Sequence, residues 1–401
     1  MSLQISNRAL ALKPSASIAA KKMVADLQAQ GQEIFDLTIG EPDISTPAHI
    51  VEAAYTAMKA GDTHYTASAG TPTLRTAVAA QISREKALPV KPENIAVGCG
   101  AKQLIFEVFS ATLNEGDEVI VPAPYWVSYP DLATLHGGKP VAVVCAEEAD
   151  FKLTPAALEA AITAKTRWLV LNTPNNPSGT VYSRDELLAL GEVLQRHPNV
   201  WVMTDEIYEY LSYNDERALS LIEVVPSLFE RAVIINGMSK AYAMTGWRVG
   251  YAAGPKFLID VVVKMLSQST TCASSISQAA AVAALEGDQA CVREATAMYR
   301  RRRDRMVEIL SEAPSLSPRA PWGAFYLFIS VASLIGKTTP TGKELRTDLD
   351  VSLYLLEEAK VAVLDGSAYG LSPYLRLSFA ASLEVVESGS RAIVEAINAL
   401  R

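Results

Sequence analysis

The sequence predicts an α/β protein with a large domain, in which helices flank a mainly parallel sheet, and with a smaller α+β domain. Through the middle of the 401-residue chain, short apolar runs rich in β-branched residues alternate with longer helical patterns. Continuous apolar strands separated by helices are typical of parallel sheets covered on both faces. Beyond about residue 290 the pattern changes to a long charged helix and then short strands, which indicates the second domain.

The elements are assigned in chain order. The first 45 residues hold a helical pattern and the strand-like run 33–40, and pattern alone leaves their domain open. Apolar strand runs follow at residues 94–100, 117–124, 139–146, 166–174, 199–206 and 231–239. The later part has a helix at 294–310, a stiff proline-rich connection at 313–323, and strands within 323–330, 361–366 and 374–380. We therefore predict an N-terminal arm and part of the small domain in 1–45, the large domain in 46–290 and the small C-terminal domain in 291–401.

Composition and charge exclude several classes of protein. Hydrophobic residues make up 49% of the chain and charged residues 20%, which is typical of a folded globular protein. The formal net charge of −8 gives no overall attraction to nucleic acid or to an anionic membrane surface. The basic cluster at residues 300–305 contains Asp304 and precedes Glu308, so we expect a solvated, ion-paired helix face there.

Cysteines and histidines show no metal-ligand spacing. The four cysteines lie far apart without a C-x-x-C pair, and the four histidines form no H-E-x-x-H pattern. We therefore expect no metal, and the dispersed cysteines indicate a reducing compartment. Nowhere do about 18 apolar residues run together, and Arg8, Lys13 and Pro14 interrupt the N-terminus before a signal segment could form. The expected protein is soluble and cytoplasmic.

The segment GMSKAYAMTGWRVGY, residues 237–251, carries the clearest chemical pattern. A lysine at a strand end can form an imine with an aldehyde, and Lys240 directly follows the run 231–239. Ser239 and Arg248 could bind a phosphate nearby, so an aldehyde cofactor that carries a phosphate would fit. The plainer interpretation makes Lys240 and Arg248 loop cations on a solvated turn, because lysine is mostly exposed.

Two further segments at strand ends favour the cofactor interpretation. Asp205 lies near the end of the run 199–206, where a carboxylate could keep a pyridine nitrogen protonated and make the ring an electron sink. Tyr208 and Asn176 could each bond a phenolate oxygen on that ring. Taken singly, these residues are also explained as a helix cap, core packing and an Asn-Pro turn. Because open α/β sheets bind ligands at the carboxyl ends of their strands, the three loops predict one site.

Together the motifs NTPNNPSG (172–179), DEIY (205–208) and SKAYAMTGWRVGY (239–251) resemble those of class I pyridoxal-phosphate aminotransferases. The chain is most similar to the bacterial aspartate aminotransferase branch, which includes aspartate/prephenate enzymes, from KPSAS near residue 13 to YLRLSFA near residue 374. The resemblance implies the fold-type I architecture, pyridoxal 5′-phosphate as cofactor and a homodimer with active sites at its interface. It also implies transamination between an amino acid, L-aspartate first, and a 2-oxo acid such as 2-oxoglutarate, with prephenate as a further acceptor.

The resemblance implies a role for each matching residue around the cofactor. Lys240 would carry the cofactor as an imine and act as the base of the proton shift, with Asp205 on the pyridine nitrogen. Asn176 and Tyr208 would contact the ring O3′. The other cofactor contacts would be Trp126 on the ring face, then Gly100, Ala101, Lys102, Ser239, Arg248 and, from the neighbouring subunit, Tyr65 around the phosphate. Position 237 is Gly where some branches carry serine, so one phosphate contact would be missing or replaced by solvent.

On the substrate side, Arg376 matches the arginine that binds the α-carboxylate, a task suited to its planar bidentate geometry. Gly40 matches a backbone contact to the same group, and Trp126 and Asn176 would also contact the substrate.

The residues for the substrate side chain carry less support. Lys102 and Ser15 match positions that the bacterial branch uses for the side-chain carboxylate, and Lys13 matches a lysine associated with prephenate use. Lys102 is also explained as a surface cation at the phosphate loop, and Lys13 as a solvated arm residue.

Rival functions have weaker support. A nucleotide-binding oxidoreductase would use the turn 98–100, but Gln103 replaces the third glycine of its motif. A non-catalytic binding protein on the same fold would have no need to keep Lys240, Asp205 and Arg376 together. A β-lyase shares the carbanion chemistry, and it stays open together with a broad-specificity or aromatic aminotransferase.

Overall fold

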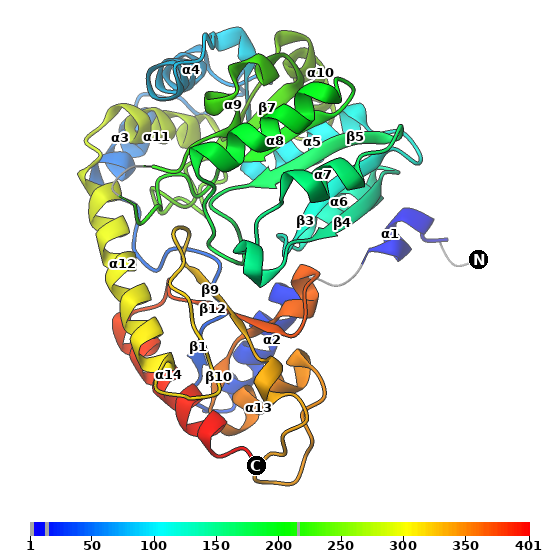
Figure 1. The fold of residues 1–401 in the computed structure, drawn as a ribbon. Coiled ribbons are helices and arrows are strands. Elements are labelled where there is room, and N and C mark those ends of the chain that lie inside the picture. Colours follow the sequence, from blue (N-terminus) through cyan, green and yellow to red (C-terminus); the bar gives the residue numbers. More distant parts are fainter. Residues whose placement is uncertain (1–3, 13–15, 215–216) are drawn as a thin grey trace.

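The structure, a computed structural model, describes residues 4–12, 16–214 and 217–401 (Figure 1). Its largest feature is a seven-stranded sheet in the order β2-β8-β7-β6-β5-β3-β4. Neighbouring strands run parallel except at β8, which is antiparallel to both β7 and β2. The strands are β2 (Ile95–Gly98), β3 (Glu118–Ala123), β4 (Lys139–Val144), β5 (Thr166–Asn172), β6 (Trp201–Asp205), β7 (Ala232–Gly237) and β8 (Gly250–Ala253).

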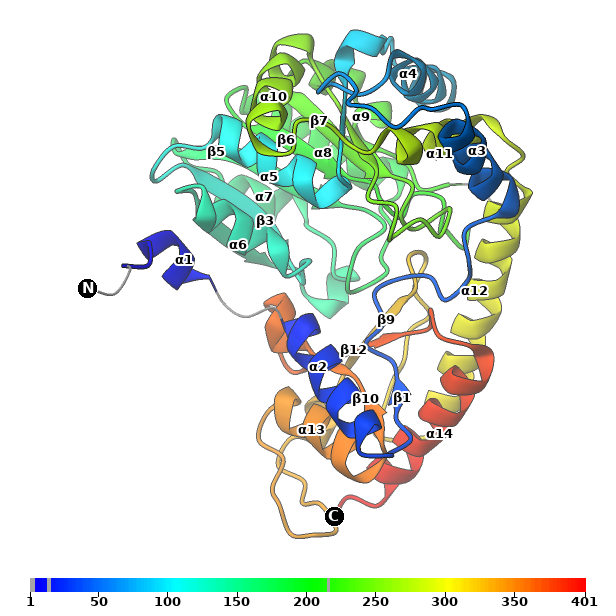
Figure 2. The ribbon, with the colours of Figure 1, turned by 180° about the vertical axis from the view of Figure 1, so that it is seen from behind.

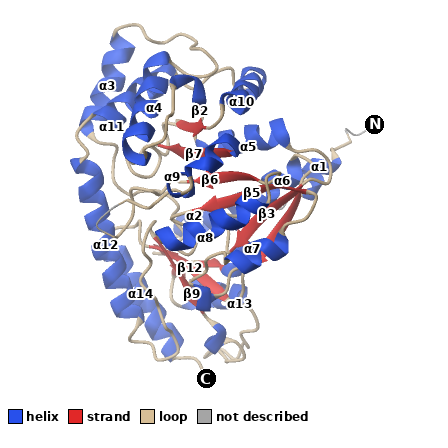
Figure 3. Ribbon diagram, turned by 45° about the horizontal axis from the view of Figure 1, so that its top comes forward, coloured by secondary structure: helices blue, strands red, loops and turns tan. Residues whose placement is uncertain are grey.

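Helices cover both faces of this sheet, as Figure 3 shows. Successive residues of the central strands belong to different cores: Leu169 packs on one face and Val170 on the other, and both are buried. The continuous apolar strand runs follow from this double burial. The first face is covered by α3 (Ala48–Lys59), α4 (Pro72–Lys86), α7 (Pro155–Ala161), α8 (Arg184–Arg196), α9 (Leu221–Val224) and α11 (Ser275–Glu286), and the second by α5 (Ala101–Thr112), α6 (Ser128–Leu135) and α10 (Lys256–Ser269). The predicted fold class is confirmed.

Strand β8 is the one member of this sheet that the sequence pattern does not predict, because GYAA lacks β-branched residues. Gly250 pairs with Gly237 of β7 and with Gly98 of β2. A Cβ at Gly250 would come within 2.7 Å of the Ala101 nitrogen, so glycine lets α5 begin this close to the sheet. The reversal after Lys240 thereby returns the chain to the N-terminus of α5.

A second, smaller body packs around its own core in the lower half of Figures 1 and 2. Strands β9 (Tyr326–Ser330), β11 (Leu364–Asp365) and β12 (Tyr374–Ser378) form an antiparallel sheet in the order β11-β12-β9. Strand β1 (Phe35–Asp36) pairs in parallel with β10 (Val361–Ala362), so the N-terminal strand joins C-terminal elements. The helices here are α2 (Ala16–Ala29), α12 (Ala290–Leu310), α13 (Asp348–Glu358) and α14 (Leu383–Asn398), while α1 (Asn7–Ala11) lies apart. Short 3-10 turns occur at Pro92–Asn94, Glu147–Ala149, Pro226–Arg231, Ala332–Leu334 and Gly366–Tyr369.

The basic cluster on α12 is only in part the solvated, ion-paired face that the sequence predicts, because Arg303 pairs with Asp304 and Arg305 with Glu308, whereas Arg302 is buried. Arg302 is buried and donates two hydrogen bonds to the Asp43 carboxylate, at 2.7 and 2.9 Å. Arg300 donates to the Tyr213 carbonyl at 2.6 Å, and the Arg303 guanidinium lies 4.7 Å from the Tyr213 ring centroid. The prediction holds for Arg305, whose ion pair with Glu308 is formed at 2.8 Å, and for the exposed Arg301, but it is wrong for Arg302, because α12 runs along both bodies and meets their loops (Figure 1).

The described residues contain neither a membrane-crossing helix nor a cluster of metal ligands. Among them, no helix combines the length and the apolar character needed to cross a membrane. The same part of the chain holds no grouping of three or more His, Cys, Asp or Glu side chains placed to bind a metal ion.

Candidate active site

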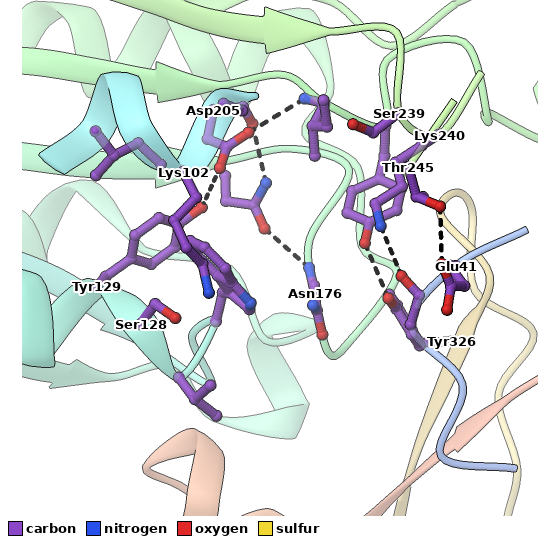
Figure 4. Close-up of a pocket in the computed structure, with 18 of the residues that line it drawn as sticks. Glu41, Lys102, Ser128, Tyr129, Asn176, Asp205, Ser239, Lys240, Thr245 and Tyr326 are labelled. Atoms are coloured by element: carbon purple, nitrogen blue, oxygen red, sulfur yellow. Dashed lines mark hydrogen bonds between the residues drawn. The ribbon is translucent and has the colours of Figure 1, made fainter. Parts of the chain in front are cut away.

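A cavity of about 380 Å³ opens at the carboxyl ends of β5, β6 and β7 (Figure 4). Asn172 and Asp205 are the last residues of β5 and β6, and Lys240 follows β7. Carboxyl ends of parallel strands meet at one sheet edge, and this is why distant loops contribute to the cavity. Its lining includes the sequence-predicted residues Gly40, Ala101, Lys102, Trp126, Asn176, Asp205, Tyr208, Ser239, Lys240, Arg248 and Arg376.

Asp205 is a buried carboxylate with two hydrogen bonds. Its Oδ2 accepts from the Tyr129 hydroxyl at 2.6 Å, and its Oδ1 accepts from the Ile207 N–H at 3.2 Å. Burial raises the pKa of Asp205 to about 6, although the bond from Tyr129 favours the ionised form. The carboxylate therefore carries a full negative charge only above about pH 6, and it could hold a protonated ring nitrogen there.

Lys240 reaches from the end of β7 across the cavity to the N-terminal segment. Its Nζ donates a hydrogen bond to the Gly40 carbonyl at 2.6 Å and lies 5.9 Å from the ring centroids of Tyr208 and Phe325. Desolvation among these rings lowers the pKa of Lys240 to about 8. A sizeable fraction of neutral amine is thus present near neutral pH, which suits a nucleophile or a base.

The turn after β5 ties two strand ends together. The Asn172 side chain donates to the Asp205 carbonyl at 2.9 Å, and its oxygen accepts from the Asn176 N–H at 2.9 Å. Asn176 thereby presents its side chain to the cavity beside Tyr208, whose hydroxyl bonds that of Tyr326 at 2.9 Å. Burial raises the pKa of Tyr208 well above its usual value, so this phenol stays protonated.

An anion-binding corner forms where β8 returns to α5. Gly100, at φ 88°, caps α5, and the Arg248 guanidinium donates to the Thr245 and Cys99 carbonyls at 2.8 and 3.3 Å. A Cβ on Gly100 would lie 2.6 Å from Arg248 Nη2, so any side chain there would displace the guanidinium. A helix N-terminus beside an arginine suits a phosphate.

Gly237 has no room for the serine that the resemblance suggested could stand at this position. A Cβ on Gly237 would approach Gly250 Cα to 2.9 Å and the Val249 carbonyl to 3.0 Å, and both contacts are with backbone. The anion corner of this chain is therefore built without that hydroxyl.

Arg376 carries a buried guanidinium that lines the cavity and donates two hydrogen bonds. Nη1 donates to Asn176 Oδ1 at 3.1 Å and Nη2 donates to the Thr38 carbonyl at 2.7 Å, while the group lies 4.3 Å from the Tyr326 ring centroid. Its Nε has no hydrogen-bond partner within the described residues. Both hydrogen-bond acceptors are neutral and the guanidinium lines the cavity, so its charge suits a carboxylate that enters there.

Lys102 and Trp126 face one another on the opposite wall. Lys102 Nζ lies 4.7 Å from the Trp126 ring centroid, and burial, then Arg248, lowers the pKa of this lysine. Lys102 is exposed and at the same time lines the cavity, so its ammonium can reach a group bound there.

Four predicted residues are not among the described residues that line the cavity. Tyr65 is 87% exposed and does not line the cavity of its own chain. Lys13 and Ser15 lie outside the described residues. Gly100 contributes through its contact with Arg248 rather than through the cavity wall.

Sequence reasoning missed several lining residues. Tyr129 lies three residues after Trp126, which precedes the start of α6 at Ser128, so no helical spacing connects the two. Tyr326 and Thr245 carry no recognisable signal. Glu41 accepts a hydrogen bond from the Thr245 hydroxyl at 2.7 Å and lies next to Gly40, beside Lys240 in Figure 4.

Glu41→Gln is expected to lower the pKa of Lys240 further below about 8, since desolvation lowers this pKa while the Glu41 carboxylate raises it. The other charged groups that act on Lys240, namely Arg376, Arg248 and Asp205, are unchanged by the substitution. We expect a fall of about 0.5 to 1 pH unit. The pH dependence of Lys240 labelling by an amine-reactive reagent, in cofactor-free protein, measures it.

Thr245→Val is the matched control, because it removes the hydrogen bond to Glu41 and leaves the charge. Its shift should be the smaller of the two. An unchanged or higher pKa in Glu41→Gln would contradict the electrostatic role of Glu41.

A nucleophilic lysine, a buried carboxylate and an anion corner at the carboxyl edge of an α/β sheet suit an enzyme that uses a phosphate-bearing aldehyde. The chain belongs to the aminotransferase class I and II family, whose model matches residues 32–393. It is 48% identical over 382 residues to a probable aspartate/prephenate aminotransferase of Rhizobium leguminosarum bv. phaseoli, which covers 95% of this chain and 96% of the relative.

Two solved structures extend the comparison. The aspartate aminotransferase of Rhizobium meliloti superposes with a TM-score of 0.97 at 44% identity, over 100% of both chains. The aspartate aminotransferase of Thermus thermophilus with maleate superposes with a TM-score of 0.92 at 39% identity, over 98% of this chain and 100% of that one. An oxidoreductase or a non-catalytic protein is not favoured by these relatives.

The family depends on pyridoxal phosphate, and the residues of this chain fit that cofactor. Gly100 leaves open the space next to Arg248 that a phosphate needs. Asp205 supplies a buried negative charge for a pyridinium nitrogen, and Lys240 supplies an amine of lowered pKa for the aldehyde.

Proposed function

We propose that this enzyme transfers amino groups between L-aspartate and a 2-oxo acid such as 2-oxoglutarate. The carrying observation is Arg376, a buried guanidinium that lines the cavity and whose hydrogen bonds go to two neutral acceptors, Asn176 Oδ1 and the Thr38 carbonyl, so that it suits a substrate carboxylate. Relatives named aspartate or aspartate/prephenate aminotransferases support this donor, and prephenate use is the corresponding second proposal. A β-lyase or an aromatic aminotransferase has less support.

The residues of the chain would divide the work as follows. When bound, pyridoxal phosphate supplies a ring that takes up the electron pair released as the substrate Cα–H bond breaks. Arg376 orients the substrate by its carboxylate, and Asp205 holds a proton near the ring nitrogen. Lys240 Nζ, with its pKa lowered to about 8 by desolvation, would take up the Cα proton and deliver it on the cofactor side, as the base of a 1,3-proton shift. Arg248 and the N-terminus of α5 hold the phosphate.

A panel of amino donors and 2-oxo acid acceptors, followed by half-reaction absorbance, tests this proposal. Aspartate should convert the cofactor to its amine form fastest, and 2-oxoglutarate should reverse the change. Release of pyruvate and ammonia from a β-substituted donor, without such conversion, would identify a β-lyase instead.

Lys102→Gln is expected to lower kcat/KM for aspartate by about 10- to 150-fold, the value of one charged hydrogen bond. The values for alanine or an aromatic donor should change little, because these side chains carry no carboxylate. Steady-state kinetics with the three donors measures the difference. Lys264→Gln, at an exposed position of α10, is the control.

Equal losses for acidic and neutral donors would contradict the role of Lys102 toward the side-chain carboxylate. Broad or aromatic specificity would then be the better interpretation.

We also propose a homodimer in which Tyr65 serves the cofactor site of the partner subunit. A second cavity, of about 700 Å³, lies on the outer side of Arg248, and Arg248 lines both cavities. Tyr65 is exposed in its own chain, as expected of a side chain that fills such a space on another copy.

Mixing Tyr65→Phe and Lys240→Ala subunits tests the shared site. In the mixed dimer both lesions fall in one site, and the other site keeps Tyr65 and Lys240, so activity per intact Lys240 should exceed that of the Tyr65→Phe parent. Activity no higher than that parent's would contradict sharing.

We also propose a division of the chain into domains and a cellular location. The division at residues 46 and 291 is supported by separate hydrophobic cores, which meet around α12. A cytoplasmic location is consistent with the family and with four cysteines that form no disulfide in the structure.

A further inference from the structure

The segment 205–209, DEIYE, presents two different faces. Asp205 and Tyr208 line the cavity, whereas Glu206 and Glu209 lie behind it with exposures of 1% and 2%. Facing these two carboxylates is Lys86, the last residue of α4, which is also 2% exposed. Its Nζ lies 3.0 Å from Glu206 Oε2 and donates a short hydrogen bond to Glu209. One buried ammonium therefore holds both carboxylates.

The same carboxylates are bonded to neighbouring elements. The Ser220 hydroxyl donates to Glu206, and the Asn236 side chain donates to Glu209 Oε1 at 2.7 Å. Asn236 also accepts from the Gly237 N–H at 2.7 Å, at the end of β7 that leads to Lys240. We call these four residues the rear cluster: Lys86, Glu206, Glu209 and Asn236. The rear cluster connects α4 with the ends of β6 and β7.

The charges of the rear cluster depend on each other. Burial alone would lower the pKa of Lys86, but the two carboxylates raise it above the usual value, so Lys86 is an ammonium. Burial raises the pKa of Glu209, whereas the positive charges of Lys86 and Arg217 act to lower it, so both cations act on this carboxyl. If one partner of a buried ion pair is removed, the other charge stays buried without compensation. This lowers the stability of the folded protein strongly.

We propose that Lys86 is a positioning residue for the transamination: through Glu206 and Glu209 it holds Asp205 and Tyr208 in place and sets the electric field at Lys240. The proposal rests on the proposed function only for its effect on turnover. Lys86 is not among the residues that line the cavity, so it acts through the segment 205–209, through the end of β7 and through its charge. The Glu206 charge already acts on Asp205, in agreement with this route.

Two variants of the holoenzyme test the proposal through opposite electrical changes. Lys86→Met removes a positive charge, which favours protonation of the nitrogen that joins Lys240 to the cofactor. The pH midpoint of the cofactor absorbance should therefore rise. Glu209→Gln removes a negative charge, keeps the shape, and should lower that midpoint. We expect each shift to be about 0.5 pH unit. The other charged groups that face Lys240 are Glu41, Arg376, Arg248 and Asp205.

Cofactor affinity supplies the second readout. The Kd for pyridoxal phosphate, from titration of cofactor-free protein, should rise about tenfold in Lys86→Met, and Lys86→Arg should restore most of the loss. Ile82→Ala is the matched control, because Ile82 is buried one turn earlier in α4 and carries no charge. It should lower the melting temperature yet leave the Kd and the midpoint near wild type.

Midpoint shifts in the same direction for Lys86→Met and Glu209→Gln would overturn the proposal, as would equal changes in Ile82→Ala. Should Lys86→Met fail to fold, Glu209→Gln decides alone: an unchanged midpoint overturns the field at Lys240. Wild-type protein that binds the cofactor but does not transaminate would refute the proposed function and leave both binding readouts valid.

Discussion

Lys240→Ala is expected to lower the rate of transamination by at least about 10⁴-fold while the protein stays folded. The variant loses the amine that holds the cofactor and moves the substrate proton. The fold should persist because Lys240 makes one hydrogen bond, to the Gly40 carbonyl, and otherwise faces the cavity. Half-reaction absorbance with aspartate measures the loss, and the melting temperature measures the fold.

Borohydride reduction of wild-type holoenzyme, followed by peptide mapping, identifies the attached lysine independently of activity. The label should appear on Lys240 and vanish in the variant, whereas Lys264→Ala, an exposed control, should keep it. A label on another lysine would show that the assignment is wrong.

Asp205→Asn has the second largest expected effect, a fall in kcat of about 10²- to 10⁴-fold with a smaller change in KM. The amide keeps the size of the side chain but removes the negative charge that a protonated ring nitrogen needs. Burial raises the pKa of Asp205 to about 6 in the cofactor-free cavity, and a protonated ring nitrogen beside the carboxylate would lower it, so wild-type activity should fall only as the pH drops below about 6. The variant should lack this acid limb, and pH profiles of kcat for both proteins measure it.

Tyr129→Phe is the matched control for Asp205. It removes the hydrogen bond at 2.6 Å that favours the ionised carboxylate, so it should move the acid limb to higher pH and leave most of kcat at alkaline pH.

An Asp205→Asn enzyme whose kcat is within about threefold of wild type would contradict the role of this charge, because removal of one buried charge has a larger effect.

Much of the fold follows from local pattern. The continuous apolar runs predict strands buried on both faces, and β5 shows the reason, since Leu169 and Val170 enter opposite cores. Strand β8 is the exception. Around Gly250 the neighbouring backbones lie so close that only small residues fit, and a pattern of side-chain hydrophobicity does not reveal how close two backbones lie.

The sequence by itself determined which residues stand at the ends of parallel strands, and hence that Asn176, Asp205 and Lys240 share one sheet edge. Only the tertiary structure decided the long-range pairings: Arg376 with the Thr38 carbonyl, and the rear cluster across α4 and β7. It also buried Arg302 of α12, where charge pattern alone predicts solvent. The physical reason is that periodicity records how each segment alternates between core and solvent, whereas contacts between segments far apart in sequence depend on the order of strands and the paths of the connecting chain.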